Sequence, residues 1–219
     1  MIPLRDHATA RSFPLVNYLI IAVNCIVFLY LAAVADIEIF VNTWGFIPGR
    51  FGTEPVRALL TVLTSIFLHG GFFHLISNMW FLHIFGDNIE DSLGHLRYLY
   101  FYLIAGGVSV LAQFFVDPAS SLPLIGASGA ISGVAGAYAV LYRRSRIETL
   151  VPVFLFYEII LLPTGIFLGY WFFVQLFSGI GALTAYEGAA GGVAWFAHIG
   201  GFVFGYLFAK LGRYYSAYA

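Results

Sequence analysis

Three polar side chains of types that take part in acyl-transfer chemistry stand in otherwise apolar stretches of the sequence. Ser128 opens one stretch, while His198 and His74 lie near the starts of two others. A serine hydroxyl can act as a nucleophile and a histidine as a general base. Polar residues inside long apolar segments are costly, which makes them functional candidates by default. We therefore take Ser128 as the candidate nucleophile and His198 as its candidate general base.

The stretches that hold these residues have the character of membrane spans. Hydrophobic residues make up 61% of the 219 residues and charged residues only 10%, and the mean hydropathy is +0.89. Soluble domains carry about 25% charged residues. Apolar runs of about 20 residues recur, and each is long enough to cross a hydrocarbon core of about 30 Å as a helix. Because helices satisfy their backbone groups internally in lipid, we predict an all-α multi-pass membrane protein.

The apolar runs predict a six-transmembrane-helix bundle. The expected spans are residues 14–34, 73–89, 96–116, 126–142, 162–178 and 193–211. A long first loop covers residues 35–72. The apolar segment 147–161 contains Glu148, Pro152 and Glu158, and carboxylates in lipid would be unfavourable. We expect this segment to approach the fifth span along the membrane interface.

The positions of Lys and Arg predict the orientation, because these residues accumulate on the cytoplasmic side of a membrane. With the N-terminus inside, the external residues would be Arg50 and Arg57. The cytoplasmic residues would be Arg5, Arg11, Arg97, Arg143, Arg144, Arg146, Lys210 and Arg213. We expect both termini to be cytoplasmic, with residues 1–13 as an N-terminal segment, 14–211 as the membrane domain and 212–219 as a tail.

The candidate residues are expected to share one depth in the membrane. His74, Ser128 and His198 each precede the cytoplasmic charges of their span by a similar number of residues. At 1.5 Å per residue, all three lie about 22–24 Å above the inner boundary, or about 6–8 Å below the outer one. A lone membrane serine usually bonds its own helix or a neighbour. A shared depth on three helices favours chemistry instead.

Small residues surround both members of the candidate pair. Gly126, Gly129 and Gly133 accompany Ser128, while Gly201 and Gly205 follow His198. Small residues let membrane helices approach closely, which a short serine side chain needs in order to reach an imidazole. Glycines that serve packing alone remain an alternative, and the two roles are compatible.

Further hydrogen-bond donors stand near the nucleophile. Ser128 lies where a helix would begin, so unpaired amides and the helix dipole favour an oxyanion there. His74 and Asn78 are four residues apart and share one helix face. They could assist the Ser128 amide in binding the oxyanion, or could serve as a structural pair between helices.

Several other chemistries lack support in the sequence. His69 and His74 do not have the HExxH spacing of a zinc site, so we expect no metal. The net charge of −1 offers no basic surface for nucleic acid. Gly-x-Ser-x-Gly would need glycine at position 130, which is alanine. Since no carboxylate falls at the depth of His198, we expect a dyad. The single Cys25 is assigned no function.

These residues stand in motifs that resemble those of the rhomboid proteases. The motifs are Gly126-Ala127-Ser128-Gly129, Ala197-His198-Ile199-Gly200-Gly201 with Gly205, and His74 with Asn78, together with Phe67-Leu68-His69-Gly70-Gly71. The resemblance implies the prokaryotic six-helix form and a Ser128–His198 dyad, with an oxyanion site from His74, Asn78 and the Ser128 backbone amide. It also implies transmembrane-helix substrates, no metal or organic cofactor, and a prokaryotic cytoplasmic membrane.

Two features depart from the family pattern, and a third concerns access. Val56-Arg57 stands where many members have Trp-Arg, and Ser132 stands where some have a tyrosine beneath the histidine. The means of holding His198 is therefore open. The fifth span, with Trp171, Phe172 and Gln175, resembles the mobile gate helix of the family.

The sequence thus predicts an intramembrane serine endopeptidase that cuts transmembrane segments near their external end. A catalytically inactive relative that binds and escorts membrane helices is the alternative, although such relatives have usually lost Ser128 or His198. A transporter or channel would be expected to show internal repeats or charged midplane residues. Membrane lipid and helical substrates are the expected partners, whereas the oligomeric state is not predicted.

Overall fold

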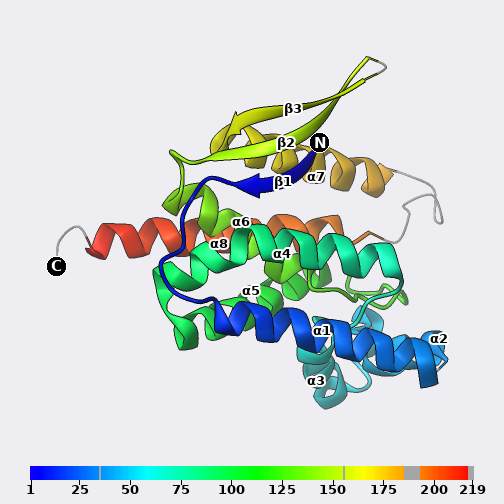
Figure 1. The fold of residues 1–219 in the computed structure, drawn as a ribbon. Coiled ribbons are helices and arrows are strands. Elements are labelled where there is room, and N and C mark those ends of the chain that lie inside the picture. The colour runs from blue at the N-terminus through cyan, green and yellow to red at the C-terminus, as the bar shows by residue number, and fades with distance from the viewer. Residues whose placement is uncertain (35, 155, 185–192, 217–219) are drawn as a thin grey trace.

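The computed structural model is a bundle of helices flanked by a small sheet (Figure 1). It describes all residues except 35, 155, 185–192 and 217–219. The long helices are α1 (Leu15–Val34), α4 (Phe72–Leu93), α5 (His95–Val116), α6 (Ser128–Leu141), α7 (Thr164–Thr184) and α8 (Trp195–Ser216). The helices α4, α6 and α8 begin at the same end of the bundle, which we call the site end.

The long helices coincide with the six predicted apolar segments to within a few residues. Three of them are long and apolar enough to cross a membrane, over Leu15–Ala33, His95–Val116 and Thr164–Leu183. α6 has only 14 residues, and α4 carries several carboxylates near its end. The chain is therefore a mostly helical membrane protein. The number of spans and the side of the termini stay predictions.

The surface of the bundle is rich in large apolar side chains, as expected for a protein in lipid. Phe73 is 87% exposed, Phe115 78% and Phe177 69%. Apolar groups on this scale would be unfavourable in water and are at home in a hydrocarbon environment. The first loop adds three short elements at the site end, namely α2 (Ile37–Trp44), the 3-10 helix η1 (Pro48–Arg50) and α3 (Pro55–Ser65).

A buried carboxylate ties α1 to α4. The side chain of Glu90 is fully buried, and its two oxygens accept the backbone N–H groups of Val16 and Asn17 at 2.9 and 2.7 Å. These amides lie in the first turn of α1, where the helix itself offers no acceptor. His95 Nδ1 lies 2.5 Å from the same carboxylate. Glu90 therefore caps a neighbouring helix and complements the positive end of its dipole.

The polar contacts continue from α1 into α5. Tyr98 donates its hydroxyl proton to Asn17 Oδ1 at 2.7 Å, and Asn17 Nδ2 donates to the carbonyl of Leu82 at 3.1 Å. A side chain at Gly86 would meet Asn17 Oδ1 at 2.2 Å, so glycine is required for this approach. One asparagine thus joins three helices.

The three-stranded sheet is the main feature that the sequence did not predict. Its antiparallel strands, in the order β1-β2-β3, are β1 (Ile2–Asp6), β2 (Arg146–Val153) and β3 (Phe156–Pro163). The expected interfacial segment 147–161 is in fact most of this hairpin. Alternating burial of Ile147 and Thr149 along β2 is typical of a strand with one covered face.

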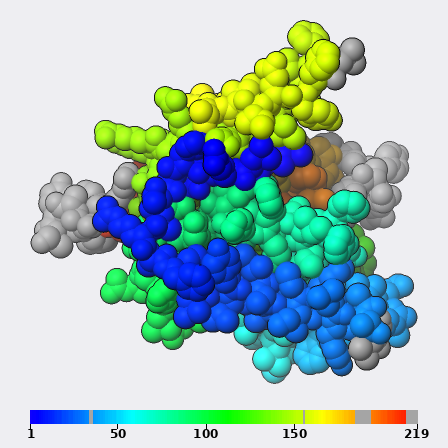
Figure 2. Space-filling view, viewed as in Figure 1, coloured from blue at the N-terminus to red at the C-terminus, as the bar shows by residue number. Residues whose placement is uncertain are grey.

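The first strand is fastened to the bundle as well as to the hairpin. Trp80 Nε1 in α4 donates to the carbonyl of Pro3 at 2.6 Å. Asp6 accepts hydrogen bonds from Asn88 Nδ2 at 2.9 Å and from the Tyr138 hydroxyl. β1 accordingly lies on the surface between the hairpin and α4 (Figure 2), while β2 and β3 contact α7. The sheet bridges α4 and α7.

Replacing Glu90 with alanine is expected to destabilise the fold by about 2–4 kcal/mol, because two amides lose charge-assisted hydrogen bonds. The measurement is the free energy of unfolding in a detergent and SDS titration. Glu54→Ala is the matched control. Glu54 pairs with Arg57 at 3.0 Å on the surface, and exposed pairs contribute less than about 1 kcal/mol. Equal losses in the two variants would contradict the capping role.

Candidate active site

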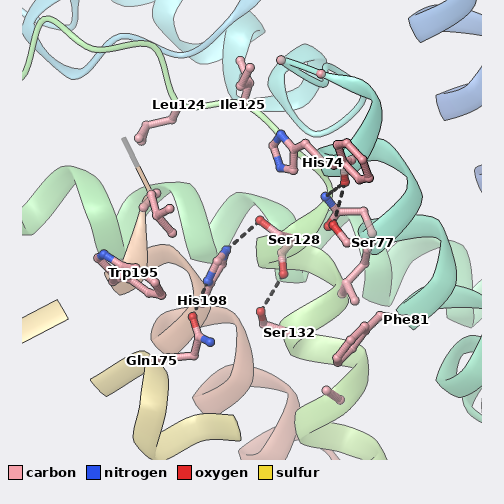
Figure 3. Close-up of a pocket in the computed structure, with 18 of the residues that line it drawn as sticks. His74, Ser77, Phe81, Leu124, Ile125, Ser128, Ser132, Gln175, Trp195 and His198 are labelled. Atoms are coloured by element: carbon pink, nitrogen blue, oxygen red, sulfur yellow. Dashed lines mark hydrogen bonds between the residues drawn. The ribbon is translucent and has the colours of Figure 1, made fainter. Parts of the chain in front are cut away.

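A cavity of about 750 Å³ opens at the site end of the bundle (Figure 3). Its walls come from the start of α4, the loop before α6, one face of α6, the middle of α7 and the start of α8. The lining includes His74, Asn78, Phe81, Ser128, Ser132, Trp171, Gln175, Trp195 and His198. The candidate residues that the sequence predicted at one depth therefore share one cavity.

Ser128 and His198 face each other across this cavity. Ser128 is the first residue of α6 and His198 the fourth of α8. His198 Nε2 lies 2.7 Å from Ser128 Oγ, within hydrogen-bond distance. This is the geometry that a serine nucleophile and its general base require.

The position of Ser128 at a helix start also provides hydrogen-bond donors for an anion. The first-turn amides of α6 have no acceptor within their own helix, and the positive end of the helix dipole lies there. The backbone carbonyl of Ser128 accepts the Ser132 hydroxyl at 2.6 Å. Ser132 thus bonds its own helix rather than supporting His198.

The support of His198 comes instead from α7. Gln175 Oε1 lies 2.7 Å from His198 Nδ1, on the opposite side of the ring from Ser128 (Figure 3). The Trp171 ring lies 6.2 Å from the imidazole at an interplanar angle of 35°, and Trp195 meets it edge-on at 6.3 Å. The sequence alone indicates Gln175 only as part of the gate helix. A polar residue inside an apolar span, one turn after Trp171, was the available signal.

His74 and Asn78 line the cavity from α4, as the shared face predicted. Asn78 Nδ2 donates to the backbone carbonyl of His74 at 2.8 Å, which leaves one amide hydrogen for another acceptor. The rings of His69 and His74 pack edge to face with centroids 5.1 Å apart. Burial, together with the smaller effect of the neighbouring His74, lowers the pKa of His69 to about 3. Neutral His69 therefore packs behind His74.

Gly126 lies between His74 and the nucleophile. Its φ of +116° belongs to the region that favours glycine. A Cβ at this position would lie 2.8 Å from His74 Nε2 and 3.7 Å from Ser128 Oγ. Gly126 therefore leaves room for the His74 ring, whereas the sequence analysis had grouped it with the glycines that pack helices together.

The other four glycines do lie where helices meet. A Cβ at Gly205 would come within 1.8 Å of the Gly133 carbonyl oxygen, and one at Gly201 within 2.1 Å of the Gly129 carbonyl oxygen. Gly129 itself faces Ser109 Oγ of α5, which a Cβ would meet at 2.0 Å. α6 and α8 are thus in backbone contact directly below the Ser128–His198 pair.

The two predicted gate aromatics have different positions. Trp171 lines the cavity and lies 6.5 Å from Phe81 of α4, between centroids. Phe172 packs on Phe202 of α8 at 4.9 Å and does not line the cavity. Trp171 and Phe81 therefore meet between α4 and α7 at the wall of the cavity, while Phe172 joins α7 to α8.

No three His, Cys, Asp or Glu side chains come together as metal ligands in the part of the chain that the structure describes. Asp, Glu, Lys and Arg are also absent from the described lining of the cavity. The chemistry that these walls can support is nucleophilic attack by serine with a neutral histidine as base.

The comparison with protein families agrees with this arrangement. The family model of the rhomboid domain matches residues 56–215. The chain belongs to the rhomboid family. The matched part contains every candidate site residue, whereas β1, α1 and α2 precede it. The sequence resemblance is thereby confirmed at the level of the family.

Curated rhomboid relatives match parts of the chain. The putative rhomboid protease YdcA of Bacillus subtilis (strain 168) is 35% identical over 88 residues, 39% of this chain and 44% of that protein. RHOMBOID-like protein 4 of Arabidopsis thaliana is 33% identical over 154 residues, 67% of this chain and 32% of that protein. The mitochondrial presenilin-associated rhomboid-like protein of Bos taurus is 32% identical over 111 residues, 48% of this chain and 29% of that protein.

The chain spans less than half the length of each of these relatives. Because they include mitochondrial and plant proteins, the prokaryotic cytoplasmic membrane stays a prediction for this rhomboid. Its assignment to a membrane rests on the family and on the apolar helices.

Replacing Gly205 with alanine is expected to push α8 away from α6, because the new Cβ would overlap the Gly133 carbonyl. We expect a loss of about 1–3 kcal/mol in unfolding free energy and slower reaction of Ser128 with a fluorophosphonate. Gly169→Ala on α7 is the matched control, since no described atom beyond its chain neighbours and the adjacent backbone of α7 lies within 4 Å of its Cβ position. Unchanged stability and serine reactivity in Gly205→Ala would contradict the close-packing requirement.

Proposed function

We propose that this rhomboid is an intramembrane serine endopeptidase in which Ser128 and His198 form a catalytic dyad. The 2.7 Å contact between Ser128 Oγ and His198 Nε2 carries the proposal. The cavity around it and the family membership add support.

In the proposed reaction, Ser128 Oγ attacks the carbonyl carbon of a peptide bond as His198 Nε2 takes the hydroxyl proton. The tetrahedral intermediate collapses to an acyl-enzyme, and His198 returns the proton to the departing amine. A water molecule then attacks the ester, again giving a proton to His198, and the proton returns to Ser128 as the acid product leaves. Residues of this chain supply every group that the reaction needs, so no metal or organic cofactor is proposed.

The negative charge of the intermediate would be stabilised by the amide of Ser128 together with His74 and Asn78. Because Ser128 is the first residue of α6, the unpaired first-turn amides lie beside the nucleophile. His74 and Asn78 line the same cavity from α4. Donors aimed at the developing oxyanion typically contribute about 10²–10³ in rate each.

The proposed substrates are transmembrane helices of other proteins. Ser128 begins α6, and His74 and His198 lie in the first turns of α4 and α8. If the site end is external, the scissile bond lies about four or five residues inside a substrate span. A helical peptide bond must unwind before attack, which favours substrates with Gly, Ala, Ser or Pro near that end. The products are then an external fragment and a membrane-held remainder.

The dyad is tested with purified protein and a panel of membrane-helix substrates. Ser128→Ala and His198→Ala should each abolish cleavage and fluorophosphonate labelling while the unfolding profile in detergent is kept. Ser132→Ala is the matched control, since this hydroxyl bonds the Ser128 carbonyl and not the imidazole. Full cleavage by Ser128→Ala would refute the proposal, and an inert wild-type protein would favour a helix-binding escort.

Mass spectrometry of the fragments from the same digestion locates the scissile bond in the substrate span and so tests the depth of Ser128. Scissile bonds found consistently at the cytoplasmic end of the substrate span would contradict both the proposed orientation and the depth of Ser128.

Access to the site is tested at the Phe81–Trp171 contact between α4 and α7. Phe81→Ala should raise the rate on membrane substrates several-fold if separation of α4 and α7 limits turnover, because it removes the ring that faces Trp171. Phe177→Ala is the control, since Phe177 is 69% exposed and is not among the residues that line the cavity. A crosslink between α4 and α7 that leaves membrane-substrate cleavage unchanged would argue against lateral entry.

A further inference from the structure

On the side of the ring away from Ser128, His198 contacts a polar side chain of another helix. Gln175 Oε1 lies 2.7 Å from His198 Nδ1, and the Gln175 side chain is only 7% exposed. Figure 3 shows Ser128 and Gln175 on opposite sides of the imidazole. The three side chains form a line from α6 through α8 to α7.

The direction of the hydrogen bonds along this line determines whether His198 can act as a base. A neutral imidazole has one N–H and one nitrogen lone pair. The atom of Gln175 that faces Nδ1 is the amide oxygen, which only accepts. This contact is therefore a hydrogen bond when the proton of His198 is on Nδ1, and the lone pair of Nε2 then faces the Ser128 hydroxyl. The other tautomer would direct an N–H towards the serine and could not take its proton. The contact with Gln175 therefore selects the tautomer that acts as a base.

We propose that Gln175 is a positioning residue of this dyad, so that Ser128, His198 and Gln175 act as a triad whose third member is a neutral amide. The proposal rests on the proposed protease function. A neutral acceptor suits this cavity, because His74 and His198 are its only titratable lining residues among those described. A carboxylate here would have no permanent cationic partner and would be costly to bury.

The place of Gln175 in the chain gives the contact a second consequence. Gln175 follows Trp171 by one turn of α7, so both lie on one face of that helix. Trp171 packs against the His198 ring, and the same tryptophan contacts Phe81 of α4. Two of the contacts that hold His198 thus come from the helix that lines the proposed substrate entrance. Displacement of α7 from α8 would remove both contacts, leaving the histidine free to change tautomer.

The test compares Gln175→Met and Gln175→Glu in the purified full chain. Methionine keeps the volume but removes the acceptor, and we expect kcat to fall about 10–100-fold with KM nearly unchanged, as for other partners that orient a histidine through its second nitrogen. Glutamate restores an acceptor, so we expect recovery of kcat relative to methionine. The acid side of its pH–rate profile should move to higher pH, because a carboxylate stabilises the protonated imidazole.

Gln113→Met is the matched control. Gln113 Oε1 accepts the backbone N–H of Phe196 at 3.1 Å, so it supports the start of the same helix α8 without touching the imidazole. We expect this variant to lose stability while keeping the pH–rate profile of the wild type. If Gln113→Met reproduces the kcat loss and pH profile of the Gln175 variants, the positioning role is overturned.

Nitrogen NMR of ¹⁵N-histidine-labelled protein reads the tautomer directly, with His198→Ala used to assign the signals. Wild type should show a protonated Nδ1 and an unprotonated Nε2 at His198, and Gln175→Met should show a mixture. Wild-type kcat and an unchanged His198 spectrum in Gln175→Met would overturn the proposal. If the wild-type protein neither cleaves membrane helices nor reacts with a fluorophosphonate, the protease function fails, and the NMR comparison still decides whether Gln175 sets the tautomer.

Discussion

The backbone contact between α6 and α8 is the constraint on which the site depends. A serine side chain is short, so its hydroxyl reaches an imidazole on another helix only when the two helices nearly touch. Gly133 and Gly205 provide that approach, with no space for even one Cβ between them. Almost every residue of α6 is buried as a result. The most enclosed helix of the bundle therefore carries the nucleophile, and the less buried helices surround it.

The bundle separates rigid from adjustable parts around this contact. α6 and α8 are fixed by backbone proximity, and α1, α4 and α5 are joined by Glu90 and Asn17. α7 differs, because its contacts near the site are aromatic rings and one amide side chain. Side-chain contacts of this kind can adjust by a change of rotamer, whereas interlocked glycines have no side chain to move. The architecture thus places the more adjustable helix beside the cavity.

Much of this arrangement could be predicted from residue types. Hydrophobic length located the long helices to within a few residues, since the requirement of a lipid core is nearly independent of tertiary contacts. Counting from the charged ends placed His74, Ser128 and His198 at one level, where the structure brings them into one cavity. Ser128 and His198 were paired because nucleophile and base are chemically distinctive.

Other features depend on contacts between distant segments, which periodicity does not reveal. The segment that forms β2 and β3 has the composition of an apolar run, and β1, one of the two partners of β2, lies more than 100 residues earlier in the sequence. Gln175 was visible as a polar residue in a span, but the side of α7 that meets His198 depends on how the helices pack. The positive φ of Gly126 and the packing of Phe172 on Phe202 of α8 likewise depend on contacts between distant segments.

The pairing of β1 with β2 has a consequence for biosynthesis. Ile2 pairs with Leu150, so the first strand leaves the ribosome long before its partner exists. Among the described residues, Trp80, Asn88 and Tyr138 are those of the bundle that hydrogen-bond to this strand. Contacts so distant in sequence are slow to form because the intervening chain must first be ordered. β1 is therefore synthesised well before β2 and can reach its final place only after β2 has followed.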